Sequence, residues 1–224
     1  FGSAGCWMTQ NLRTKTYADG TTLTLGVNAD PASKFYNYPN GNEQIFINHP
    51  EYGLLYTWAA ATNRAATSAN ETNSSSQQQY QGICPSGWHL PSDYEWLQLE
   101  EEIAKSGAGV YSSTTATQWE TSYSILSSDY RGGHGRKMKS ATVVNSINPN
   151  GTSNVHTANG FDALLVGYIG ATTSPAYGAS SSFVSSSSVN AGYCVRVLFT
   201  SASAGANHDL QPKYVLRSVR CKKN

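Results

Sequence analysis

The segment from Gly82 to Trp96 constrains the fold most, because it joins a cysteine, an aromatic turn and the start of a helix. Ser92 is followed three residues later by Glu95, the spacing of a capping box, in which each side chain bonds the backbone amide of the other residue. This pattern predicts a helix over 92–106, with an apolar face made of Trp96, Leu97, Leu99, Ile103 and Ala104. Trp88 and Trp96 are then expected to be buried at the two ends of this unit. The segment therefore indicates architecture rather than an active site.

Stretches rich in β-branched and aromatic residues predict short strands at 7–12, 34–38, 54–58 and 164–169, and longer strands at 192–200 and 213–221. The 192–200 stretch is apolar on both sides except for Arg196, which predicts a central strand rather than an edge strand. A short helix is expected at 59–63. Strands interrupted by two helices indicate the α+β class.

Polar spans separate these elements at 65–79, 106–117, 180–188 and 201–207. Loops this long in a compact domain are either mobile or functional. None of them contains a repeat or has the length of a linker. We therefore expect surface insertions on one scaffold, and a single domain over residues 1–224.

Composition excludes several classes of function. A net charge of +1 and a charged fraction of 13 % give no basis for binding nucleic acid or an anionic membrane surface. No apolar run is long enough to insert into a bilayer. The first residue is Phe1 rather than Met, so a leader could have been removed. An even number of cysteines in a chain rich in Ser, Thr and Tyr favours export to an oxidising compartment, at the cell surface or outside the cell.

Catalytic signatures are missing from the sequence. It contains no Gly-x-Ser-x-Gly, no phosphate-binding loop and no His-Glu-x-x-His. The histidines are scattered without metal-ligand spacing and are expected to be structural: His49, His89, His134, His156 and His208. The acidic run 100–102 is expected to lie on the solvated face of the predicted helix. The sequence therefore predicts a protein that is not an enzyme.

Five blocks resemble, in order, the Fibrobacter succinogenes major paralogous domain of Bacteroidetes surface proteins. They are Trp-Met-Thr-Gln-Asn-Leu-Arg at 7–13, Tyr-Gly-Leu-Leu-Tyr-Thr-Trp at 52–58, Gly-Ile-Cys-Pro-Ser-Gly-Trp-His-Leu-Pro-Ser at 82–92, Asn-Gly-Phe-Asp-Ala-Leu at 159–164 and Ser-Val-Arg-Cys at 218–221. The resemblance implies a C-type-lectin-like fold, a twisted antiparallel sheet with two helices and long loops. The stretch 89–96 is also similar to a motif of formylglycine-generating enzymes, which belong to the same fold superfamily.

The four cysteines permit three pairings. The resemblance implies a disulfide between Cys84 and Cys221, since both lie in matching blocks. This leaves Cys6 and Cys194 for a second disulfide. Zinc is the alternative, but no pair has Cys-x2-Cys or Cys-x4-Cys spacing. A formylglycine-generating activity would need two free thiolates for copper late in the chain, where one of the two cysteines is Cys221.

We predict no cofactor. Calcium stays an alternative, because Asn148-Pro149-Asn150 offers oxygen ligands, although the Trp-Asn-Asp triplet of calcium-dependent lectins is missing. The resemblance implies a surface binding module, an adhesin or a fimbrial tip-like component with a glycan or protein ligand. We expect the contact zone in 129–190, where the candidate residues are Tyr130, Arg131, Asn148, Asn150, Tyr177 and Asn190. The competing hypothesis is a structural subunit of a surface appendage, which an open strand edge or a flat apolar patch would favour.

Overall fold

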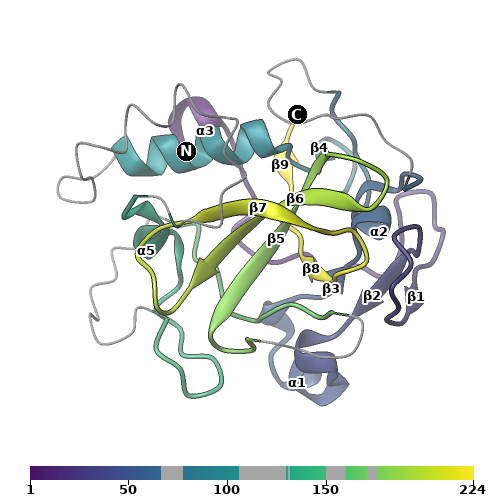
Figure 1. The fold of residues 1–224 in the computed structure, drawn as a ribbon, viewed down its shortest axis with the longest axis horizontal. Helices are drawn as coiled ribbons and strands as arrows, with labels where there is room; N and C mark the ends of the chain where they lie inside the picture. Colours follow the sequence, from purple (N-terminus) through teal and green to yellow (C-terminus); the bar gives the residue numbers. More distant parts are fainter. Residues whose placement is uncertain (67–77, 106–129, 131, 150–159, 171–175) are drawn as a thin grey trace.

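The structure is a computed structural model that describes residues 1–66, 78–105, 130, 132–149, 160–170 and 176–224. Within these ranges, one sheet holds seven strands in the order β1-β2-β3-β8-β5-β6-β7, and β4 pairs with β9 in a second, small sheet (Figure 1). The strands are β1 (Thr24–Leu25), β2 (Phe35–Asn37), β3 (Leu55–Tyr56), β4 (Trp88–His89), β5 (Ser180–Ser188), β6 (Tyr193–Thr200), β7 (Asn207–Pro212), β8 (Arg217–Ser218) and β9 (Lys222–Lys223).

The helices lie around this open sheet, with α3 at the top of Figure 1 and α1 at the bottom. They are α1 (Glu43–Asn48), α2 (Trp58–Thr62), α3 (Asp93–Lys105) and α5 (His134–Met138), and short 3₁₀ turns occupy Gly2–Ala4, Pro39–Gly41 and Pro50–Tyr52. The α+β content is therefore as predicted. The expected purely antiparallel sheet is wrong in two places, because β1 pairs with β2, and β5 with β8, in parallel.

Most of the predicted elements are present at or near their expected positions. The stretches 34–38, 54–58, 192–200 and 213–221 contain β2, β3, β6 and β8, and the two predicted helices correspond to α2 and α3. β6 lies between β5 and β7, which confirms that it is a central strand. The stretches 7–12 and 164–169 instead run beside other segments and form only isolated bridges, such as Trp7 with Lys222 and Ile169 with Leu216.

The serine-rich span 180–188 is the largest correction to the expected fold. It is not a surface insertion but strand β5, in which all nine residues are buried. Small serine side chains fit between the layers that cover this strand. The Ser185 hydroxyl donates to the Val195 carbonyl at 2.8 Å, and the Ser187 hydroxyl accepts from the Asp93 amide at 2.9 Å. Phe183 of this strand packs in the hydrophobic core.

The start of α3 matches the predicted capping box. The Ser92 amide donates to the Glu95 carboxylate at 2.9 Å, and the Glu95 amide donates to the Ser92 hydroxyl at 3.2 Å. Trp96 is fully buried, as predicted, with its ring 4.9 Å from that of Trp7 and 5.3 Å from that of Phe183, measured between ring centroids. The prediction that Trp88 is buried is wrong, since this side chain is only half-buried.

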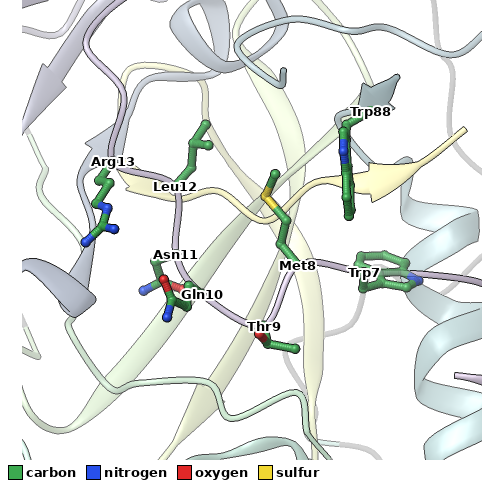
Figure 2. A pocket seen from close by; sticks show the side chains of 8 residues that line it. All are labelled: Trp7, Met8, Thr9, Gln10, Asn11, Leu12, Arg13 and Trp88. Atoms are coloured by element: carbon green, nitrogen blue, oxygen red, sulfur yellow. The ribbon is translucent and has the colours of Figure 1, made fainter. Parts of the chain in front are cut away.

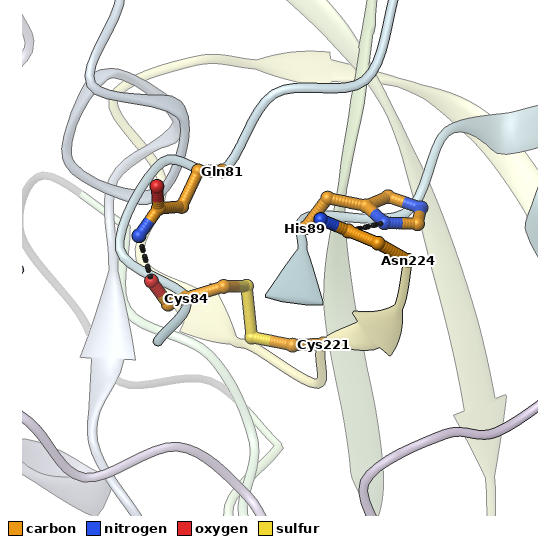
Figure 3. The surroundings of a disulfide bond; sticks show 5 residues. All are labelled: Gln81, Cys84, His89, Cys221 and Asn224. Atoms are coloured by element: carbon orange, nitrogen blue, oxygen red, sulfur yellow. Dashed lines mark hydrogen bonds between the residues drawn. A yellow bond between two sulfur atoms is a disulfide. The ribbon is translucent and has the colours of Figure 1, made fainter. Parts of the chain in front are cut away.

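Cys84 and Cys221 form the predicted disulfide, which joins positions 137 residues apart in sequence (Figure 3). The predicted second disulfide is wrong, because Cys6 and Cys194 are free thiols. Cys6 is exposed near the N-terminus, whereas Cys194 is buried in β6 and donates its S–H to the Gln211 carbonyl at 3.6 Å. Two cysteines in such different environments cannot bond without rearranging the central sheet.

Candidate functional site

An open groove of about 430 Å³ runs along the N-terminal segment 7–13 and is bounded by Trp88 (Figure 2). The segment is held to the C-terminal run of the chain by two backbone hydrogen bonds of 2.9 Å, from the Met8 amide to the Cys221 carbonyl and from the Leu12 amide to the Val219 carbonyl. The groove is therefore formed where the two ends of the chain lie side by side.

The floor of the groove is fixed by side chains that already have partners. Trp7 is buried and donates its indole N–H to the Ala4 carbonyl at 2.9 Å. Asn11 is buried as well; its amide N–H donates to the Tyr52 carbonyl at 3.0 Å, and its amide oxygen accepts from Arg220 at 3.0 Å. These side chains hold the shape of the groove and have little hydrogen-bonding capacity left for a ligand.

Arg220 explains why several of the matching blocks lie together. Its guanidinium is completely buried and donates to the backbone carbonyls of Phe161 and Asp162 as well as to Asn11. Its carbon Cζ also lies 4.3 Å from the centroid of the Phe161 ring. Residues from blocks 7–13, 159–164 and 218–221 therefore meet around one buried cation, which supports the groove from below.

The wall formed by Trp88 is positioned by the end of the chain. Trp88 lies in β4 and pairs with Lys223 of β9, directly after the disulfide at Cys221. His89 fixes the same turn, because its ring nitrogens lie 2.7 Å from the Asn224 side-chain oxygen and 2.9 Å from the Glu95 carboxylate (Figure 3). The structural role expected for this histidine is thus confirmed.

The exposed rim of the groove carries Thr9, Gln10 and Arg13. Across the described residues, none of these three side chains has a hydrogen-bond partner or an ion-pair partner. Met8, Leu12 and Trp88 are half-buried and present apolar surface beside them. A half-exposed indole ring next to unengaged hydroxyl, amide and guanidinium groups is a combination suited to a polar ligand with an apolar face.

The four predicted ligand contacts that the structure describes do not line this groove. Tyr130 is 40 % exposed, Tyr177 is half-buried against an apolar cluster, and Asn148 is also half-buried. The Asn190 side-chain oxygen accepts from the Gly192 amide at 2.9 Å and the Tyr193 amide at 3.0 Å, so it stabilises a turn. Arg131 and Asn150 lie outside the described residues. The role of these six residues stays a prediction.

A second cluster of functional groups is buried beneath α3. The two ring nitrogens of His208 lie 2.5 Å from an Asp93 carboxylate oxygen and 2.6 Å from a Glu100 carboxylate oxygen, while a His134 ring nitrogen lies 3.0 Å from the second Glu100 oxygen. All four side chains are at most 3 % exposed. The expectation that Glu100 lies on a solvated face is therefore wrong.

Burial acts to lower the pKa of His208, but the carboxylates of Glu100 and Asp93 outweigh it and raise this pKa to about 9. Burial acts to raise the pKa of Glu100, but His208 and His134 hold it well below its ordinary value. His208 is therefore a cation at neutral pH, and the cluster joins α3 to β7 and α5. The cluster is thus a buried network of ion pairs that links these elements.

The described residues contain neither a cluster of metal ligands nor a membrane-spanning helix. No set of three or more His, Cys, Asp or Glu side chains there is arranged to bind a metal ion. No helix in the described ranges is long and apolar enough to cross a membrane.

Comparison with known proteins agrees with the resemblance of the five blocks. Residues 3–223 match the Fibrobacter succinogenes major domain. No curated protein and no solved structure gave a match. Because the matched region spans almost the whole sequence, the chain belongs to the Fibrobacter succinogenes major domain family.

Proposed function

We propose that this protein is an exported cell-surface binding module of the adhesin type, and that it binds a glycan in the groove between segment 7–13 and Trp88. The observation that carries this proposal is the half-exposed Trp88 ring beside the unengaged side chains of Thr9, Gln10 and Arg13. Sugars have apolar C–H faces that pack on aromatic rings and hydroxyls that need hydrogen-bonding partners, so this combination suits them.

A protein ligand suits the groove less well. Protein interfaces depend on large apolar or aromatic side chains that become fully desolvated. The exposed large hydrophobic residues of the described chain are Leu25, Val27, Ile47, Tyr130, Val143 and Tyr193, and none of them lines the groove. A small polar ligand is therefore the better match to the groove lining.

Three features support the cell-surface and fold parts of the proposal. The disulfide between Cys84 and Cys221 persists in an oxidising compartment. Membership of the family supports surface display. The twisted sheet with helices at its margins and the disulfide near the chain end support a C-type-lectin-like architecture over one domain, residues 1–224.

We also propose that the protein is not an enzyme. A formylglycine-generating activity needs two free thiolates, but Cys221 is bonded to Cys84 and burial raises the pKa of the Cys194 thiol. The buried Asp93, Glu100 and His208 groups have no opening to a substrate.

One observation favours a second candidate function, a structural subunit. β1 is an edge strand with an exposed burial pattern, and Leu25 and Val27 at this edge are 50 % and 42 % exposed. An uncovered edge can pair with a strand of a neighbouring subunit. Concentration-dependent assembly in analytical ultracentrifugation, abolished by Leu25→Lys, would support this function over glycan binding.

A glycan array probed with the purified protein, with and without calcium, tests the main proposal. We expect binding that Trp88→Ala reduces by at least about tenfold, which corresponds to about 1.4 kcal/mol. Tyr193→Ala is the matched control, since this aromatic residue is 46 % exposed and lies outside the groove. Gln10→Ala changes only an exposed side chain and tests the site independently of folding. A protein that binds no glycan, or binds equally well after both groove substitutions, would contradict the proposal.

A further inference from the structure

Arg13 is the only charged residue among the eight that line the groove. It is exposed and, within the described parts of the chain, has no carboxylate partner. Other arginines are engaged: Arg196 pairs with Asp209, the Arg64 guanidinium carbon lies 3.9 Å from the Tyr80 ring centroid, and Arg217 donates to backbone carbonyls. The groove therefore has a positive charge that no acidic side chain among the described residues neutralises.

The guanidinium group of Arg13 favours a carboxylate as its binding partner. Its planar donors match the two oxygens of a carboxylate, and a charge-assisted pair of this kind is stronger than a neutral hydrogen bond. The apolar surface of Met8, Leu12 and Trp88 restricts water on one side of the site, which weakens screening of the pair. No acidic residue lines the groove to repel an anionic ligand.

The order of the lining side chains in Figure 2 bears on the kind of ligand that the groove can hold. Arg13 lies at one end of the groove and Trp88 at the other, with Met8 and Leu12 between them. A ligand that touches both ends must pass over these two side chains, and a chain of linked sugar units can do this. Thr9 and Gln10 are available along the rim for its hydroxyls, whereas Asn11 is already bonded to Arg220.

We propose that the groove selects an acidic oligosaccharide, with one sugar ring against Trp88 and the carboxylate of a uronic acid unit on Arg13. This inference rests on the proposed function, because it specifies the glycan that the same groove binds. The carboxylate then contributes to the affinity in addition to the contact of the sugar ring with Trp88.

The test compares oligogalacturonate and oligomannuronate with their carboxyl-reduced, neutral counterparts by isothermal titration calorimetry. We expect each acidic oligomer to bind about tenfold more tightly than its neutral counterpart, which is the gain of one charge-assisted pair at a partly exposed site. High salt should reduce this preference, because salt screens exposed charges.

Arg13→Gln should remove the preference, so that the acidic and the neutral oligomer bind the variant with similar affinities. Lys105→Gln is the charge-matched control: it also removes one positive charge, from the exposed end of α3, and should keep the preference. Both substitutions change exposed side chains, so the melting temperature should hold.

Equal affinities for acidic and neutral oligomers, or an unchanged preference in Arg13→Gln, would overturn the acidic inference while the proposed glycan-binding function stands. If the protein binds neither type of oligomer, the acidic inference is wrong. A glycan array without any binding would then overturn the proposed function as well.

Discussion

The buried cluster around His208 should make the stability of the protein depend on pH in a defined direction. The folded-state pKa of His208 is about 9, above its ordinary value of 6.5. A group whose pKa is raised by folding contributes stability that is fully present below its unfolded pKa and is lost as the pH rises through the folded pKa. The contribution of His208 is therefore complete below about pH 6.5 and is lost towards pH 9.

The size of this effect follows from the same shift. A difference of about 2.5 pKa units corresponds to about 3 kcal/mol at full protonation, of which about 2 kcal/mol should be lost between pH 6 and pH 8. Lys139 acts in the opposite direction, because burial lowers its pKa to about 8 and its deprotonation favours the folded state. Its effect lies mainly above that pKa, so the His208 effect dominates below pH 8.

Urea unfolding at pH 6 and pH 8 measures this difference. We expect His208→Gln and Glu100→Gln to unfold more easily at pH 6 and to lose much of the pH dependence, because each removes one partner of a buried pair. His49→Gln is the matched control, since His49 is exposed, lies 3.1 Å from the Glu51 carboxylate and stacks on the Tyr52 ring. Direct titration of the His208 imidazole by NMR needs no substitution, and a pKa below about 7 would refute the reasoning.

Two further predictions concern the core and the cysteines. Trp96→Ala should cost about 3 to 5 kcal/mol in urea unfolding, because it leaves a cavity beside Trp7 and Phe183, and a loss below about 1 kcal/mol would place the ring at the surface. Replacing the Cys84–Cys221 pair by serines should cost about 4 to 5 kcal/mol by the loop-entropy estimate for the 137-residue separation. Non-reducing peptide mapping should recover that pair linked, and linkage of any other pair would contradict the structure.

Local chemistry was the part of the fold that the sequence predicted well. The capping box at Ser92 and Glu95 depends on a spacing within one turn of helix, so no distant contact can change it. The apolar run at 192–200 predicted a central strand because both faces need apolar cover. The Cys84–Cys221 pair followed from the family resemblance rather than from local geometry.

The predictions that are wrong concern residues whose burial depends on distant parts of the chain rather than on the local sequence. Strand β5 has the composition of a surface loop, yet it is an inner strand whose faces are covered: Val184 packs in a cluster with α2, and Phe183 packs in a cluster with α3. From the sequence alone, Glu100 is expected to be solvent-exposed, because it stands next to Glu101 and Glu102. The helical period nevertheless places it on the face of Trp96 and Ile103, and this signal could have identified it as buried.

The groove could not be predicted from the sequence, since its segments are far apart in the chain. The sequence predicts a strand at 7–12, whereas in the structure this stretch lies outside the named strands and donates to the carbonyls of Val219 and Cys221. The contact residues predicted in 129–190 rest on the composition of these loops. Composition does not indicate which loops lie together in the fold. Of that set, Asn190 is an example of a polar residue occupied by its own turn.

The groove lies against the C-terminal run of the chain, so its shape depends on the contacts that hold this run in place. Segment 7–13 rests on residues 219–221, Arg220 fixes the floor through Asn11, and Cys221 is bonded to Cys84 four residues before Trp88. The unengaged rim and the Trp88 wall can therefore keep their relative positions only while the C-terminal run stays in place. The disulfide between Cys84 and Cys221 restrains that run, so the geometry of the groove should depend on this bond staying oxidised.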